Sequence, residues 1–85
     1  MENLGLGKVL LVEDDEKLAG LVAHFLAQHG FEVRVVHRGD AALAVFLDFK
    51  PKIVVLDLML PGQSGLHVCR EIRTVSDTPI VILTA

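Results

Sequence analysis

Short apolar runs alternate with longer segments of helix-like periodicity along this 85-residue chain. The apolar runs are too short for helices, and runs that are apolar on both faces are typical of strands buried in a parallel sheet. The predicted strands are 8–12, 32–36, 53–56 and 80–83. The predicted helices are 16–29, a segment that begins at Gly39-Asp40 and ends before Pro51, and 66–75.

Each predicted helix carries apolar residues three and four positions apart, which defines one apolar face. In the first helix these are Leu18, Leu21, Val22, Phe25 and Leu26. In the second they are Ala42, Val45, Phe46 and Phe49. In the third we expect Val68, Ile72 and Val75 on the buried side. Asp15 can cap the start of the first helix and Gly30 can end it in a left-handed conformation.

The alternation of strands and helices predicts the α/β class, as a doubly wound parallel sheet with helices on both faces. We expect one domain over 8–85, preceded by a flexible lead-in at 1–7. In such sheets ligands bind at the carboxyl ends of the strands. Functional residues are therefore expected directly after the strands.

Composition narrows the functional classes. Hydrophobic residues make up 52% of the chain, which excludes a disordered tail. No apolar run approaches a membrane span and no signal peptide is evident, so we expect a cytoplasmic protein without membrane contact. The single cysteine allows neither an internal disulfide nor a cysteine-ligated zinc site. Basic residues are scattered, so we expect no direct nucleic-acid binding by this part of the chain.

Acidic residues concentrate where strands end. Glu13-Asp14-Asp15 follows the first strand, Asp57 the third, and Thr84 ends the fourth. If the strand order is 2-1-3-4, these groups share one edge, where clustered carboxylates repel unless a cation lies among them. Oxygen ligands in an open cleft suit Mg²⁺, particularly with phosphate oxygens nearby. A structural alternative remains, because Asp57 could cap a loop and the acidic run could favour a helix N-terminus.

Three motifs resemble a known family. They are Leu10-Leu11-Val12-Glu13-Asp14-Asp15, then Val54-Val55-Leu56-Asp57-Leu58-Met59-Leu60-Pro61-Gly62 with Gly65, and Pro79-Ile80-Val81-Ile82-Leu83-Thr84-Ala85. From Lys8 onward the chain resembles the receiver domain of bacterial two-component response regulators, of the winged-helix transcription-factor class related to PhoB and OmpR. The resemblance implies a flavodoxin-like (CheY-like) sheet of order 2-1-3-4.

The resemblance also implies a signalling domain rather than an enzyme, with at most self-catalysed phosphoryl transfer and dephosphorylation. Asp57 matches the phosphoacceptor. It would receive a phosphoryl group from a sensor histidine kinase or from a small phosphodonor. The implied Mg²⁺ ligands are Glu13, Asp14, Asp57 and the backbone carbonyl of Met59. The implied switch and phosphate-binding residues are Thr84 and Ala85, and the implied loop residues are Pro61, Gly62 and Gly65. In the parent protein the domain would control a DNA-binding transcription regulator.

The acidic pair could instead be Asp14-Asp15, although the apolar strand that ends at Val12 favours Glu13-Asp14. A complete receiver continues through a fourth helix, a fifth strand with a terminal lysine, and a fifth helix, which residues 1–85 do not contain. We therefore expect a truncated receiver that self-associates through an exposed sheet face or through edge strand 80–83. The alternative function is an interaction or dimerisation module that cannot be phosphorylated.

Two further rival functions fit less well. A haloacid-dehalogenase-type phosphatase would need a second aspartate where Met59 stands. A flavodoxin-like cofactor site would need a phosphate-binding loop after the first strand, where acidic residues would repel phosphate. The histidines lie at no spacing typical of metal ligands, so we expect structural or solvated roles for them; they are His24, His29, His37 and His67.

Overall fold

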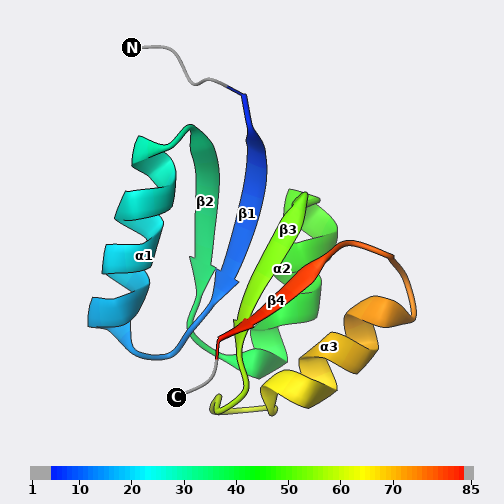
Figure 1. The fold of residues 1–85 in the computed structure, drawn as a ribbon. Helices are drawn as coiled ribbons and strands as arrows, with labels where there is room; N and C mark the ends of the chain where they lie inside the picture. The colour runs from blue at the N-terminus through cyan, green and yellow to red at the C-terminus, as the bar shows by residue number, and fades with distance from the viewer. Residues whose placement is uncertain (1–4, 84–85) are drawn as a thin grey trace.

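The computed structural model describes residues 5–83, which form one parallel sheet with helices on both of its faces (Figure 1). The strands are β1 (Gly7–Val12), β2 (Phe31–Val36), β3 (Ile53–Asp57) and β4 (Ile80–Leu83). The helices are α1 (Glu16–Gln28), the short 3-10 helix η1 (Gly39–Ala41), α2 (Ala42–Phe49) and α3 (Gly65–Arg73). The strand order is β2-β1-β3-β4, with every pair parallel, so the predicted fold class is confirmed.

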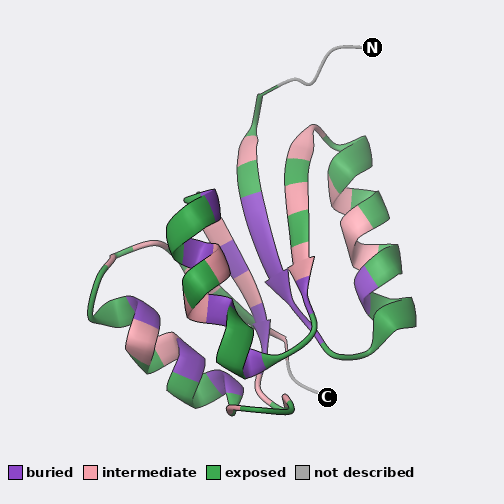
Figure 2. Cartoon of the chain, turned by 180° about the vertical axis from the view of Figure 1, so that it is seen from behind, coloured by how far each residue is buried: buried purple, intermediate pink, exposed green. Residues whose placement is uncertain are grey.

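The main core lies between the sheet and the helices α2 and α3. Successive side chains of a strand point to opposite faces, so Leu10 and Val12 of β1 share this face with Val54 and Leu56 of β3, and all four are buried. Figure 2 shows the buried positions along β1 and β3. The opposite face of β1 is buried as well, beside α1. Burial on both faces explains why these strands are nearly continuous apolar runs.

Local chemistry sets the helix ends close to the predicted positions. The side chain of Asp15 accepts a hydrogen bond of 3.0 Å from the backbone N–H of Leu18, which caps α1. Gly30 follows α1 with a φ of 96°, a conformation that favours glycine. The second helical segment begins as the 3-10 turn η1, and it ends at Phe49, followed by the cap residue Lys50 and then Pro51.

The expectation that Val75 is buried is wrong. Helix α3 ends at Arg73, and Val75 lies beyond the C-terminal cap residue Thr74. The apolar spacing therefore no longer describes a helix face at this position, and the side chain is 55% exposed. Val68 and Ile72, which lie inside the helix, are fully buried as predicted.

The face of the sheet that carries α1 is only partly covered by the described residues. Leu21 and Phe25 of α1 are 70% and 58% exposed, so their part of the predicted apolar face is not packed against the sheet. Val81 of β4 points to this same face, opposite Ile80, and is exposed too. Within residues 5–83, no helix is both long enough and apolar enough to cross a membrane.

Burial within α3 leads to the first prediction. We expect Ile72→Ala to lower the free energy of unfolding by about 2–4 kcal/mol, because it leaves a cavity beneath α3. The control Val75→Ala removes exposed methyl groups and changes it by less than about 0.5 kcal/mol. Urea unfolding followed by circular dichroism measures both variants. Equal losses in the two variants would contradict the burial pattern of α3.

Candidate functional site

The candidate site lies at the carboxyl edge of the sheet, where β1 and β3 run side by side. Val12 pairs with Leu56, so Glu13 and Asp57, the next residues along the two strands, emerge together. Asp14 follows in the loop that leads to α1. The parallel pairing of two buried strands therefore brings together residues that lie more than forty positions apart in the sequence.

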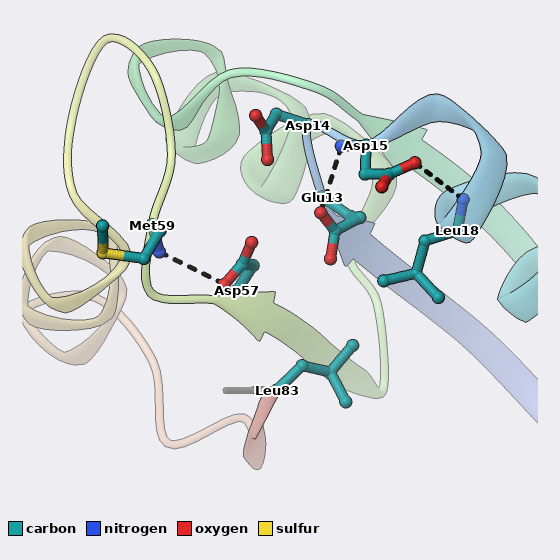
Figure 3. Close-up of a pocket in the computed structure, with 7 residues that line it drawn as sticks. All are labelled: Glu13, Asp14, Asp15, Leu18, Asp57, Met59 and Leu83. Carbon is teal, nitrogen blue, oxygen red and sulfur yellow. Dashed lines mark hydrogen bonds between the residues drawn. The ribbon is translucent and has the colours of Figure 1, made fainter. Parts of the chain in front are cut away.

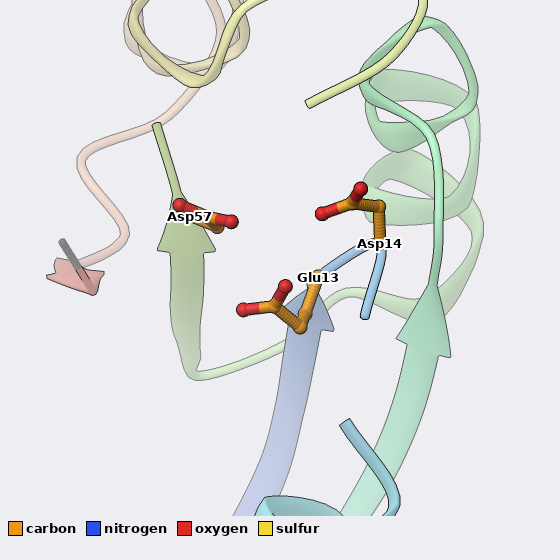
Figure 4. Close-up of side chains that lie close together, drawn as sticks. All are labelled: Glu13, Asp14 and Asp57. Atoms are coloured by element: carbon orange, nitrogen blue, oxygen red, sulfur yellow. The ribbon is translucent and has the colours of Figure 1, made fainter. Parts of the chain in front are cut away.

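Three carboxylates converge at this edge (Figure 4). One oxygen from each of Glu13, Asp14 and Asp57 lies within 4.8 Å of the other two. Glu13 is 3% exposed and Asp57 is 9% exposed, whereas Asp14 is open to solvent. Two of the three charges are thus largely removed from water, where burial of an ionised carboxylate is costly unless a cation or hydrogen bonds compensate.

The cluster lines a cleft of about 360 Å³ (Figure 3). The lining residues are Glu13, Asp14, Asp15, Leu18, Asp57, Met59 and Leu83. The part of the lining that residues 5–83 form combines acidic and apolar residues and contains no lysine or arginine. The cleft as the described residues form it is therefore suited to a cation rather than to a free anion.

The loop after β3 holds the Asp57 carboxylate in place. The backbone N–H of Met59 donates a hydrogen bond of 3.2 Å to Asp57 Oδ1. The N–H of Gly65 donates to the carbonyl of Leu58, and a Cβ at Gly65 would collide with the carbonyl oxygen of Asp57. Glycine at this position thus lets the start of α3 approach the end of β3 closely.

The structure separates the roles of the three acidic residues after β1. Asp15 caps α1 through its side chain, and its own N–H donates a hydrogen bond of 3.1 Å to Glu13 Oε2. Its side chain is not part of the three-carboxylate group. Of the two possible acidic pairs, Glu13-Asp14 is therefore the one that the geometry favours.

The pKa of Glu13 is raised above its ordinary value of 4.5. Burial is the largest cause, because it disfavours the charged form. The negative charges of Asp57 and Asp14 raise the pKa further, while the hydrogen bond from Asp15 opposes the shift. The site is thus electrostatically strained by its own carboxylates.

These residues fit a divalent cation. Carboxylate oxygens are the ligands that Mg²⁺ prefers, and Mg²⁺ uses few protein carboxylates because it retains several waters. The open side of the cleft, beside Asp14, leaves room for such waters. The side chains of Glu13, Asp14 and Asp57 would hold the ion.

Some of the remaining predicted site residues lie in the loop after β3, and others lie outside the described residues. Met59 is one of the residues that line the cleft. Pro61 and Gly62 lie in the loop between β3 and α3, where the Pro61 carbonyl accepts a hydrogen bond from the N–H of Gly39. Thr84 and Ala85 lie outside the described residues.

Comparison with known proteins identifies the family. The model of the response regulator receiver domain matches residues 9–85. The chain belongs to the response regulator receiver domain family. The predicted similarity to response regulators is thereby confirmed, and it favours a receiver over a module that only resembles one.

Individual relatives agree with this assignment. Sensory transduction protein RegX3 of Mycobacterium tuberculosis is 51% identical over 77 residues, which cover 91% of this chain and 34% of RegX3. The BeF3-activated N-terminal receiver domain of Klebsiella pneumoniae RstA superimposes with a TM-score of 0.88 at 44% identity, covering 91% of this chain and 66% of that one. TrrA of Thermotoga maritima, solved in complex with Mg²⁺-BeF, superimposes with a TM-score of 0.88 at 33% identity. The match covers 94% of this chain and 70% of the TrrA chain. The chain spans about a third of the length of the curated relatives that it matches.

Sequence reasoning missed one contact of the site. His37 was expected to be structural or solvated, and its Nδ1 lies 2.8 Å from the carbonyl oxygen of Glu13. The only available signal was its position directly after β2, at the same edge of the sheet as Glu13. Residue spacing does not reveal this contact, because the partner is a backbone atom.

The raised pKa of Glu13 leads to the second prediction. The folded state holds this proton more tightly than the unfolded state does, so ionisation of Glu13 lowers stability as pH rises. In Mg²⁺-free buffer at neutral pH we expect Glu13→Gln to raise the melting temperature by about 4 °C, equivalent to about 1 kcal/mol in a domain of this size. The advantage shrinks as pH falls through the raised pKa toward 4.5.

Thermal unfolding followed by circular dichroism at neutral and acidic pH measures this effect. Glu32→Gln, at an exposed position of β2, is the matched control and should leave the melting temperature nearly unchanged. An advantage of Glu13→Gln that grows on acidification would contradict a raised pKa of Glu13 in the folded state.

Proposed function

We propose that Asp57 is the phosphoacceptor of this receiver domain. The observation that carries the proposal is the placement of a largely buried aspartate at the end of β3, in a cleft shared with two further carboxylates. A carboxylate is a competent nucleophile toward phosphorus once it is positioned against the donor. The cleft is open to solvent beside Asp14, so a phosphodonor can reach Asp57.

The reaction is a transfer of one phosphoryl group. An oxygen of the Asp57 carboxylate attacks the phosphorus of a phosphohistidine or of a small acyl phosphate. The bond from phosphorus to the donor breaks, its electron pair leaves with the donor, and an acyl phosphate remains on Asp57. The N–H of Met59 orients the carboxylate through its bond to Oδ1, which favours an aligned attack.

Glu13 and Asp14, with Asp57 and the Met59 carbonyl, are the proposed ligands of Mg²⁺. When bound, Mg²⁺ offsets the repulsion between the carboxylates and the incoming phosphate. Glu13 is held in position by the N–H of Asp15. Thr84 and Ala85, which follow β4, are the proposed switch and phosphate-binding residues.

The proposed phosphodonor in the cell is a sensor histidine kinase, and the proposed output of the parent protein is control of a DNA-binding domain. RegX3, RstA and MtrA, which the chain resembles, are described as a sensory transduction protein, a transcriptional regulatory protein and a DNA-binding response regulator. The chain matches about a third of the length of each relative. The kinase and the regulated domain are therefore proposed for the whole protein and not for this chain alone.

The third prediction concerns phosphorylation. With Mg²⁺ and acetyl phosphate, we expect intact-mass spectrometry to detect one added phosphoryl group on a version extended through the fifth strand and helix that complete a receiver. Asp57→Asn should abolish the addition, because an amide is not a nucleophile here. Asp77→Asn, at an exposed position before β4, is the matched control and should retain it. Comparing the 85-residue chain with the extended version measures how much the added segment contributes.

Phosphorylation in the extended version that persists in Asp57→Asn would contradict the assignment of the acceptor. Absence of phosphorylation in both versions would support the alternative of a domain that acts only through binding. Removal of Mg²⁺ with a chelator should abolish the reaction in either version.

We also propose that this 85-residue chain self-associates. Leu21 and Phe25 of α1 and Val81 of β4 leave apolar surface exposed on one face of the sheet. Among the described strands, β4 is paired on one side only, with β3, and a one-sided strand can pair with another chain. A second copy of the chain can cover both features at once.

Self-association gives the fourth prediction. We expect the weight-average mass from multi-angle light scattering to rise with concentration above that of a 9.3 kDa monomer. Val81→Lys should reduce the rise, because it places a charge on the edge strand. Lys17→Ala, on the exposed side of α1, is the control. A constant monomer mass at high concentration would contradict the proposal.

A further inference from the structure

The turn after β2, residues 37–40, includes the first two residues of η1 and contacts both halves of the candidate site. On one side His37 reaches the carbonyl of Glu13, and on the other Gly39 donates to the carbonyl of Pro61 in the loop after Asp57. The acidic residues after β1 and the acceptor loop after β3 are therefore connected through a third segment. None of the residues of this turn lines the cleft itself.

Glu13 is held at both ends of its backbone by the end of β2. Its N–H donates a hydrogen bond of 2.9 Å to the carbonyl of Val36, which continues the sheet pairing by one residue. Its carbonyl oxygen lies 2.8 Å from His37 Nδ1. A carbonyl oxygen can only accept, so Nδ1 carries the hydrogen and donates. The side chain of Glu13 thus extends into the cleft from a backbone fixed by two hydrogen bonds.

The other end of the turn is packed tightly against the acceptor loop. The N–H of Gly39 donates a hydrogen bond of 3.0 Å to the Pro61 carbonyl, and a Cβ at Gly39 would collide with the carbonyl oxygen of Gln63. Glycine is therefore required for this approach. Arg38 binds Asp40 through two hydrogen bonds of 3.0 Å, and this lowers the pKa of Asp40. The negative charge of Asp40 is thereby paired within the turn.

We propose that His37 is a positioning residue for the metal site: its Nδ1–H fixes the backbone of Glu13, and so the carboxylates of Glu13 and Asp14, relative to Asp57. The inference rests on the proposed function, because it concerns how the same site binds Mg²⁺. Groups that orient metal ligands tune affinity without touching the metal. Here the oriented element is the backbone that carries the two acidic side chains.

The donor, rather than the ring, carries this role. Asparagine offers an amide N–H close to the position of histidine Nδ1 and can restore the hydrogen bond, whereas alanine cannot. The test uses the chain itself and MgCl₂ as the probe, with the dissociation constant of Mg²⁺ measured by isothermal titration calorimetry. Urea unfolding of each variant separates a loss of affinity from a loss of stability.

We expect His37→Ala to weaken Mg²⁺ binding by about threefold to tenfold, the change that corresponds to one hydrogen bond of ordinary strength. His37→Asn should bind Mg²⁺ as the unsubstituted chain does. His24→Ala removes an exposed histidine of α1 that does not line the cleft and should leave the affinity unchanged.

Unchanged Mg²⁺ affinity in His37→Ala would overturn the inference alone. Equal weakening in His37→Ala and His37→Asn would also overturn it, because the donor would then not matter. Absence of Mg²⁺ binding by the unsubstituted chain would instead contradict the proposed function, and the inference would fail with it.

Discussion

Three carboxylates held within 4.8 Å of one another repel strongly, and the fold maintains them there without a compensating lysine or arginine in the described cleft. Burial is the largest cause of the raised pKa of Glu13, and the charges of Asp57 and Asp14 raise it further. Such an arrangement lowers the stability of the metal-free chain. Binding of a divalent cation offsets the repulsion and stabilises the folded state. The energetic cost and the proposed function of the site have the same physical origin.

The parallel sheet makes this arrangement possible. The pairing of β1 with β3 fixes where Glu13 and Asp57 emerge, and the fully buried side chains beneath them keep that pairing in place. Parallel strands present all their carboxyl ends at one edge, so loops from β1, β2 and β3 can contribute to one site. The turn after β2 is connected to the loop after β3 by the backbone hydrogen bond from Gly39 to Pro61, and to Glu13 by the side chain of His37.

Much of this was predictable because it depends on periodicity and strand ends. The four strands, the cap at Asp15 and the gathering of Glu13, Asp14 and Asp57 at one edge follow from the alternation of elements. Val75 was predicted wrongly because apolar spacing carries no information on where α3 stops. The contact of His37 with Glu13 was not predictable, because the partner is a backbone carbonyl and residue spacing carries no information on such contacts.

Side-chain carboxyl ¹³C NMR during a titration with Mg²⁺ examines the shared site most directly. The account predicts that the carboxyl resonances of Glu13, Asp14 and Asp57 shift together, along one saturable binding curve. The resonances of Asp48 and Asp77, which are exposed and lie outside the cluster, should stay in place. Shifts spread evenly over all acidic residues, or independent curves for Asp14 and Asp57, would contradict a single cation site built from these three carboxylates.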